Sequence, residues 1–409
     1  MPKLPLENPP FPPLCLVESD KESVVDLADL VVAEAIDDYE VHFAHHNGHV
    51  DSTQWVRIKQ VDDLVVYQDR QALTQRRLSR TSRSPPSLAV PHSDILTLLW
   101  SGTIRGDLDD IMCAVVNRTA EEAKAKAAFT ASTMVDFAVL ETLVDPSASD
   151  PFRGVQVKWT VNAGPALLRS VVRCRDFVYL ESTGMTTMST GERVGFQLLH
   201  SVSIPAAPEL HQHKFVRGNM TLFHLFRQKK ANVVETHVKA FIDLMGDLPL
   251  RVATTLLTSG MVSVSKLAEY ALVKKLNWQL GQRRETVSSS RSRSCHVCSS
   301  TLQGSSTLQG SSSSSSSSSR SLRQRTCTIC MNRCCARCCV SKKMVFTAPR
   351  RRDVVHKTAV VCKACIQAAV ARNGCDVARE ELSQTDRRAP EYMSWSAVSP
   401  TSSTSSMKL

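Results

Sequence analysis

Apolar side chains recur every three or four positions over residues 21–44 and predict an amphipathic helix there. Two short strands are expected within 55–70, around the turn residues Asp62 and Asp63, and a buried strand at 94–104. Helices are expected at 107–116 and 119–131. The second begins with Thr119 and has Glu122 three positions later, a capping-box pattern in which each side chain satisfies a free backbone N–H.

A series of strands is predicted after these helices, at 154–161, 170–181, 193–204, 214–227 and 233–244. In the first of them, apolar residues alternate with polar or small ones, which is typical of a strand with one covered face. Residues from about 248 to 280 are predicted to be helical, with a break at Gly260. The order of elements favours the α+β class, with a strand-rich antiparallel sheet and a long C-terminal helix.

Segments of biased composition divide the chain. Residues 1–20 are Pro-rich and are expected to be disordered, and so is the 373–409 tail. The linker at 281–326 repeats STLQGS in tandem, continues into a run of Ser and also contains the first CxxC pair. Such tracts cannot bury enough apolar surface to offset the entropy lost on ordering. The folded units are therefore expected at 21–280 and 295–370.

Composition and charge narrow the function classes. The chain has 409 residues, of which 42% are hydrophobic and 22% charged, as in an ordinary globular protein. No apolar run approaches the about 18 residues that a membrane-spanning helix needs, and six prolines in the first 17 residues argue against a secretory signal. Residues 281–372 carry 17 Lys and Arg against two acids, which favours a polyanionic partner.

Cysteine is as unevenly distributed as charge, since 11 of the 14 lie between Cys295 and Cys375. Without a secretory signal, disulfides are a poor explanation, and clustered CxxC pairs indicate zinc. Two pairs complete one tetrahedral site, so four pairs predict two Zn²⁺ ions with no open coordination position. The alternative is one zinc, with Cys295 and Cys298 free. Cys334 and Cys339 stand beside predicted ligands, and either is a possible substitute for its neighbour.

The order CxxC, CxxC-x4-CxxC, CxxC, with SKK after the third pair, resembles the FYVE zinc finger. The resemblance implies a cross-brace in which the first and third pairs share one ion and the second and fourth share the other. The implied ligand sets are Cys295, Cys298, Cys335 and Cys338 for one zinc, and Cys327, Cys330, Cys362 and Cys365 for the second.

The FYVE family binds phosphatidylinositol 3-phosphate, and this sequence departs from its ligand signature. RQRT precedes Cys327 without the expected pair of His, and Val360 and Val361 precede Cys362 where the family has Arg-Val. The Trp-Asp element is missing as well. The remaining candidates for contacts with a lipid headgroup are Arg323, Arg325, Lys342 and Lys343.

Residues from about 50 to 280 resemble START-like lipid-binding domains. The resemblance rests on SGTIRGDLDDIM (101–112), VDFAVLETLVDP and the following DPF (135–152), VQVKW (155–159), CRDFVYLESTG (174–184), GERVGFQLLHSV (191–202) and KKLNW (274–278). It implies a helix-grip fold, in which a curved antiparallel sheet wraps the last helix and leaves an apolar cavity for a lipid. Candidate lining residues are Trp159, Tyr179, Phe196, Phe215 and Phe223. The candidate headgroup contacts are Arg175 and Asp176, or alternatively Glu192 and Arg193.

The resulting hypothesis is a non-enzymatic lipid-binding protein in the cytoplasm, peripheral at endosomal or other anionic membranes. No Gly-rich phosphate loop or GxSxG motif is present, and the isolated His residues have no catalytic spacing. The alternatives are a protein-interaction scaffold with degenerate ligand sites, a RING-like ubiquitin ligase, and a nucleic-acid binder without sequence specificity. The two modules are expected to be independent, so that Cys327→Ser unfolds only the finger.

Overall fold

The computed structural model describes residues 4–7, 10–12, 14, 16–46, 48–71, 95–164, 172–246, 248–258, 260–282, 293–302, 324–347 and 354–385. Several sequence-based expectations lie outside these residues. They are the Ser run, the far end of the tail and the headgroup candidate Arg323.

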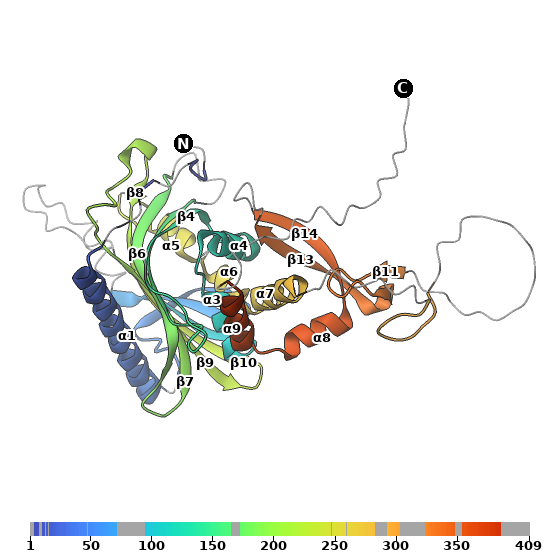
Figure 1. Ribbon diagram of the computed structural model, residues 1–409. Coiled ribbons are helices and arrows are strands. Elements are labelled where there is room, and N and C mark those ends of the chain that lie inside the picture. The colour runs from blue at the N-terminus through green and yellow to red at the C-terminus, as the bar shows by residue number, and fades with distance from the viewer. Residues whose placement is uncertain are drawn as a thin grey trace, which may run out of the picture.

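A curved antiparallel sheet forms the centre of the N-terminal domain (Figure 1). Its strands follow the spatial order β1-β2-β3-β10-β9-β7-β6-β5-β4, and the short β8 pairs in parallel with β6. The strands are β1 (Trp55–Val61), β2 (Leu64–Asp69), β3 (Leu96–Arg105), β4 (Met134–Val144), β5 (Gly154–Asn162), β6 (Arg175–Thr187), β7 (Arg193–Ser201), β8 (Val216–Arg217), β9 (Asn219–Lys230) and β10 (Val233–Asp243).

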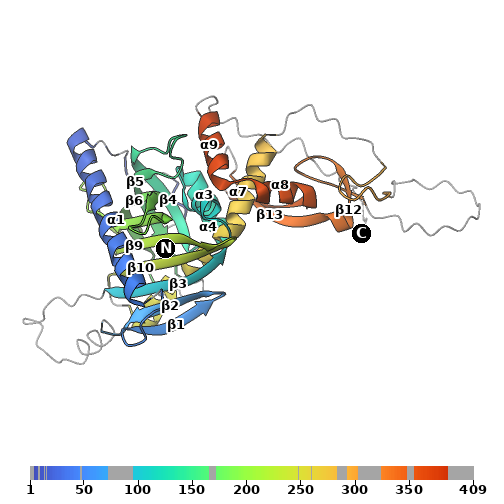
Figure 2. The same cartoon turned by 90° about the horizontal axis from the view of Figure 1, so that it is seen from below.

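Helices cover both faces of the sheet. The inner face packs on α3 (Leu108–Val115), α4 (Ala120–Thr130), α5 (Leu250–Thr258), α6 (Gly260–Ser265) and α7 (Leu267–Gly281). The outer face is covered by α1 (Glu18–His46), and a short helix, η3 (His211–His213), precedes β8. Figures 1 and 2 show α1 on the side of the sheet opposite α7. This helix-grip arrangement confirms the expected α+β START-like fold class, with the predicted closing helix divided into three pieces.

Two sets of apolar side chains explain why the sheet is covered on both sides. On the outer face, Val32 and Tyr39 of α1 pack against Phe196, Leu198 and Phe223. On the inner face, α3 and α7 share a core with β3, β9 and β10, and α3 is buried along most of its length. The Thr119 hydroxyl accepts a hydrogen bond of 3.2 Å from the Glu122 N–H at the start of α4, as the capping-box pattern predicts.

The cysteine-rich region forms a separate small unit beside α7 (Figure 2). It contains two hairpins, β11 (Gln324–Thr326) with β12 (Arg333–Cys335) and β13 (Cys339–Thr347) with β14 (Val354–Cys362). A short helix, η4 (Ala336–Cys338), links the hairpins, and α8 (Lys363–Ala371) follows β14. We call residues 293–302 and 324–371 the finger.

The chain after the finger differs from the expected disordered tail. Residues Gly374–Thr385 form the helix α9, whose Cys375 and Val377 are buried, and α9 packs on α3 and α7. A Cβ atom on Gly374 would lie 2.6 Å from the Asp109 carbonyl oxygen, so only glycine permits this approach. The sequence of α9 carries too few apolar residues to be recognised alone, because its partners are supplied by a distant part of the chain.

The finger is not the independent module that the sequence suggested. Val273 and Leu276 of α7 are buried in the same apolar cluster as the finger cysteines. The Asn277 side-chain amide donates a 3.1 Å hydrogen bond to the Val345 carbonyl of β13. Lys275 reaches Asp110 of α3 at 2.6 Å and the Arg372 carbonyl at 3.0 Å. One helix therefore belongs to the cores of both units.

Candidate metal centres

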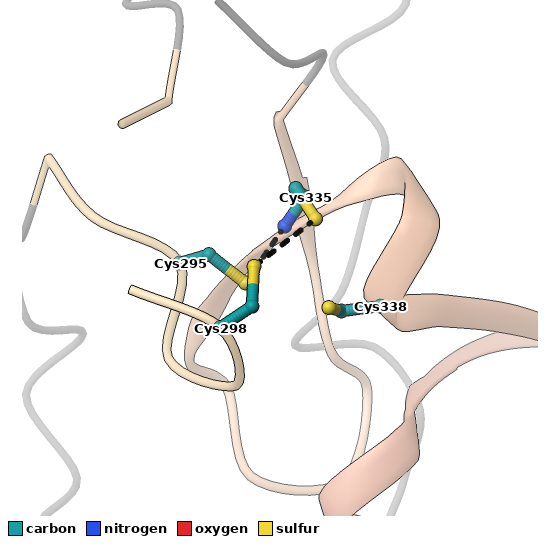
Figure 3. A group of neighbouring side chains, drawn as sticks. All are labelled: Cys295, Cys298, Cys335 and Cys338. Atoms are coloured by element: carbon teal, nitrogen blue, oxygen red, sulfur yellow. Dashed lines mark hydrogen bonds between the residues drawn. The ribbon is translucent and has the colours of Figure 1, made fainter. Parts of the chain in front are cut away.

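The first candidate metal centre joins a loop to the start of the 335–338 turn. Its four sulfur atoms, from Cys295, Cys298, Cys335 and Cys338, all lie within 4.8 Å of one another (Figure 3). The Sγ atoms of Cys298 and Cys335 are 3.8 Å apart, and the Cys335 N–H points at the Cys295 sulfur at 3.3 Å. Such backbone N–H groups stabilise a thiolate in the position of a metal ligand.

The second candidate metal centre lies between the two hairpins, at the start of α8. It is formed by Cys327, Cys330, Cys362 and Cys365, whose sulfurs also lie within 4.8 Å of one another. Two sulfur pairs, Cys327 with Cys365 and Cys330 with Cys362, are each 3.9 Å apart. The Cys362 N–H donates to the Cys327 sulfur at 3.2 Å. The first CxxC pair thus groups with the third and the second with the fourth, in the cross-brace order.

The same backbone turn shapes the first two CxxC pairs. The residue after each pair, Ser299 and Met331, has a positive φ of 58° and 60°. Its N–H bonds back to the carbonyl of the first cysteine, at 2.8 Å for Cys295 and 2.9 Å for Cys327. The left-handed residue closes the turn so that both side chains of a pair face the same point. This local geometry is why CxxC spacing carries so much information.

Hydrogen bonds prepare both centres for a cation. Hydrogen bonds from the Ser300 side chain and N–H lower the pKa of the Cys298 thiol to about 6. Hydrogen bonds from Cys330 and Cys365 lower the pKa of the Cys327 thiol well below its usual range. Each centre therefore holds thiolate at neutral pH, and a thiolate is the ligand form that soft divalent metals require.

Cys334 and Cys339 belong to neither group of four. Cys334 is fully buried and Cys339 nearly so, and burial raises the pKa of both thiols. Because four sulfurs already complete each centre, neither residue is needed as a substitute ligand. The donor set of two saturated Cys₄ groups fits two structural metal ions and leaves no position for a catalytic water.

The basic residues proposed for a lipid headgroup do not converge on one point. Arg325 lies on β11 opposite Cys334, whereas Lys342 and Lys343 are on β13 opposite Ala359 and Thr358. Consecutive residues of a strand point to opposite faces, so the two lysines extend from different sides of the hairpin. They supply positive charge to the finger without forming a pocket among the described residues.

The inner face of the sheet contains a polar group that the sequence analysis missed. Lys158 of β5 forms a buried ion pair with Glu181 of β6 and donates to the Asn117 carbonyl at 3.0 Å. The Gln197 amide donates to the other Glu181 oxygen, and a cavity of about 10 Å³ adjoins the group. The only sequence signal was a lysine enclosed by apolar residues in VQVKWTV.

Most of the predicted cavity-lining aromatics face the wrong side of the sheet. Phe196 and Phe223 pack on α1, while Trp159 and Phe215 belong to another outer cluster. Only Tyr179 lies on the inner face, packed against α5. The expectation fails because α1 covers the outer face, which gives these aromatics an apolar environment without a ligand.

The headgroup candidates on β6 are also engaged within the protein. Arg175 donates to the Leu244 carbonyl at 3.1 Å. Asp176 is fully buried, pairs with Arg217 at 2.9 Å and accepts from the Trp159 indole at 3.0 Å. They fasten one end of the sheet, and the expectation that they contact a lipid headgroup is not supported.

The fold resembles solved lipid-transfer proteins at low identity. Human StAR-related lipid transfer protein 5 is 14% identical with a TM-score of 0.40, and the match covers 61% of this chain and 97% of that chain. A STAR-related lipid transfer protein from Xanthomonas axonopodis is 14% identical with a TM-score of 0.35, covering 53% and 98%. Human STARD10 is 11% identical with a TM-score of 0.37, covering 58% and 80%.

No protein-family model and no curated protein matches this chain. The START-like fold assignment therefore rests on the sheet order and helix packing described above. None of the described helices combines the length and the apolar character needed to cross a membrane.

Proposed function

We propose that this protein is a non-enzymatic zinc protein that binds lipid through its START-like domain and contacts anionic membranes through its finger. The observation that carries the zinc assignment is the grouping of eight cysteines into two compact sets of four. Four thiolates around one point favour tetrahedral Zn²⁺ and leave no site for substrate. The proposed role of both ions is to stabilise the fold.

We expect the purified full-length protein to contain two zinc ions per chain, measured by elemental analysis. Protons compete with zinc for the thiolate sulfurs, so the metal is released as the pH falls. The Cys295 group should release its ion first, because Cys298 is exposed whereas every cysteine of the second group is buried or half-buried. A chelating dye follows the release, and a single zinc per chain would contradict the assignment.

The START-like domain is proposed to bind a lipid on its inner face. The enclosed polar group of Lys158, Glu181 and Gln197 supports this, because it offers hydrogen-bonding groups beside an interior space. The space measures about 10 Å³, which accommodates roughly one water molecule, so a lipid requires the helices to move apart. Mass spectrometry of organic extracts from the full-length protein tests this: a stoichiometric lipid supports the proposal.

The small interior space also favours a second candidate function, a protein-interaction scaffold that keeps the START-like fold without a ligand. An extract free of lipid, combined with no transfer of lipid between vesicles, would favour the scaffold. The finger would then retain its metal and lose any role at membranes. The two candidate functions therefore predict different results in the lipid measurements and the same zinc content.

Membrane contact is proposed to depend on general positive charge from the finger. Arg325, Lys342 and Lys343 supply part of it, and each basic residue near an anionic leaflet contributes about 1 kcal/mol. The His pair and the second Arg of the FYVE signature are missing, so charge is expected to outweigh stereospecific recognition of the 3-phosphate. The proposed location is the cytoplasmic face of endosomal or other anionic membranes.

Liposome co-sedimentation of the full-length protein tests this contact. We expect Lys342→Ala/Lys343→Ala to weaken binding about thirtyfold, because two charges near the leaflet contribute about 2 kcal/mol. Lys229→Ala/Lys230→Ala, at the exposed end of β9 in the START-like domain, removes the same charge and should bind like the unmodified protein. Vesicles of phosphatidylinositol 3-phosphate, its isomers and phosphatidylserine at matched charge separate specific from general binding. Equal losses in both variants would contradict a contact through the finger.

A further inference from the structure

A cluster of histidine side chains, the residue type that most often binds metals, lies on the outer face of the sheet, away from both cysteine centres. The C-terminal part of α1 meets β1, β3 and β10 around a pocket of about 180 Å³. His42, His45 and His46 of α1 and His237 of β10 line it, together with Asp38 and Lys239. Figure 1 shows α1 and the finger on opposite sides of the molecule, so this histidine pocket is separate from both cysteine centres.

Helical spacing places the imidazoles together. His42 and His46 are four residues apart and therefore share one face of α1, the same spacing that lets two histidines of a helix bind one zinc ion. Their ring centres are 5.4 Å apart, and the ring centres of His42 and His237 are 5.1 Å apart. Two imidazoles on one tetrahedral ion, with metal–nitrogen bonds of about 2.0–2.1 Å, have ring centres about 5 Å apart.

The electrostatic surroundings suit a cation. The pocket lies at the C-terminal end of a 29-residue helix, where unpaired carbonyl groups give a partial negative charge. Asp38, one turn before His42, adds a carboxylate and is paired with Lys239 at 2.7 Å. The Nε2 atom of His42 is buried and has no hydrogen-bond partner in the part of the chain that the structure describes. A buried nitrogen without a partner is costly, and a metal ion would satisfy it.

We propose that the histidine pocket binds a divalent transition-metal cation through His42 and its two imidazole neighbours, His46 and His237. Imidazole favours Zn²⁺, Cu²⁺ and Ni²⁺, and the room in the pocket leaves water in the remaining positions. Among the described residues, only the two cysteine groups already have their donor atoms within 4.8 Å. Binding therefore includes rotation of the rings about χ2, a torsion with a broad energy minimum.

The bound ion would fasten α1 to the sheet. His42 and His46 belong to the helix, whereas His237 belongs to β10, so a shared ion adds a second polar link to the Asp38–Lys239 ion pair between these two elements. This role does not depend on the proposed lipid function or on occupancy of the cysteine centres.

Equilibrium dialysis against Ni²⁺ of the full-length protein as purified, with its two zinc ions in the cysteine centres, tests the proposal. We expect one nickel per chain, with two zinc ions retained. Both His42→Ala and His46→Ala should weaken nickel binding at least tenfold, and circular dichroism checks that each variant is folded. His46 is exposed, so its replacement leaves the core intact.

His211→Ala provides the matched control, because it removes an exposed imidazole on η3, outside the pocket. It should bind nickel like the unmodified protein. Nickel binding that is unchanged in the two α1 variants, or lost in His211→Ala, would overturn the assignment. So would the absence of nickel from the unmodified protein.

Discussion

Replacing Cys327 by Ser is expected to unfold the finger and also to destabilise the START-like domain. A structural zinc site contributes about 10–16 kcal/mol to the folding of a small finger, so losing one ligand removes most of the finger's stability. The effect reaches the larger domain because α7 is common to both cores. Val273 and Leu276 lose their packing partners, and Lys275 loses the Arg372 carbonyl.

The expected size of the effect follows from the buried surface. Each fully buried aliphatic side chain contributes about 1.5–3 kcal/mol, so lost packing around Val273 and Leu276 amounts to several kcal/mol. A change of 1 kcal/mol moves the melting temperature of a domain of this size by about 2–4 °C. Scanning calorimetry of the full-length protein should therefore show the START-like transition lowered by roughly 10 °C or more.

Cys334→Ser is the matched control for Cys327→Ser. Cys334 is equally buried, lies on β12 of the same finger and belongs to neither group of four. Its replacement buries a hydroxyl at a cost of about 1–3 kcal/mol but keeps both ions. If the two variants melt alike while only Cys327→Ser loses zinc, the metal does not support the START-like domain.

The sequence was informative where structure depends on local spacing. The CxxC pairs form turns that aim two sulfurs at one point, so four pairs predicted two groups of four. The cross-brace order came from the family resemblance, since spacing alone does not say which pairs combine. The three- and four-residue periodicity of 21–44 likewise predicted α1, which extends from Glu18 to His46.

The sequence was uninformative where a distant segment decides the environment of a residue. The alternation of side chains along β5 predicts that Lys158 and Trp159 lie on opposite faces of the sheet. It does not tell which of the two faces packs against the inner helices. Both faces of β5 are buried. The more apolar face packs toward α1 on the outside of the sheet and not toward the inner helices. Similarly, α9 depends on Asp109 and α7, which lie about 100 or more residues earlier in the chain. No local sequence pattern indicates such long-range contacts.

The second large effect is expected at the buried ion pair of Lys158 and Glu181. Their side chains are only 3% and 7% exposed, so water cannot compensate for a missing partner. Removing one member of such a pair costs about 3–5 kcal/mol, because the other charge is left in the interior. We therefore expect Glu181→Leu and Lys158→Met each to lower the free energy of unfolding by this amount, measured in urea.

The double variant Lys158→Met/Glu181→Leu should recover most of that loss. Replacing both charges by apolar groups of similar size is often neutral, because the cost of desolvating two ions disappears with them. The Gln197 amide and the Asn117 carbonyl lose partners at about 1–3 kcal/mol, so the double variant should lie within about 2 kcal/mol of the unmodified protein.

Arg379→Met breaks an exposed pair with Asp376 on α9, and such a pair contributes about 0.2–1 kcal/mol. It serves as the surface control for the double-mutant cycle. Additive losses in that cycle would mean that Lys158 and Glu181 do not sense each other and that water reaches the inner face. A strong coupling would instead establish a dry, charged site in the interior, beside which any bound lipid has to place its polar group.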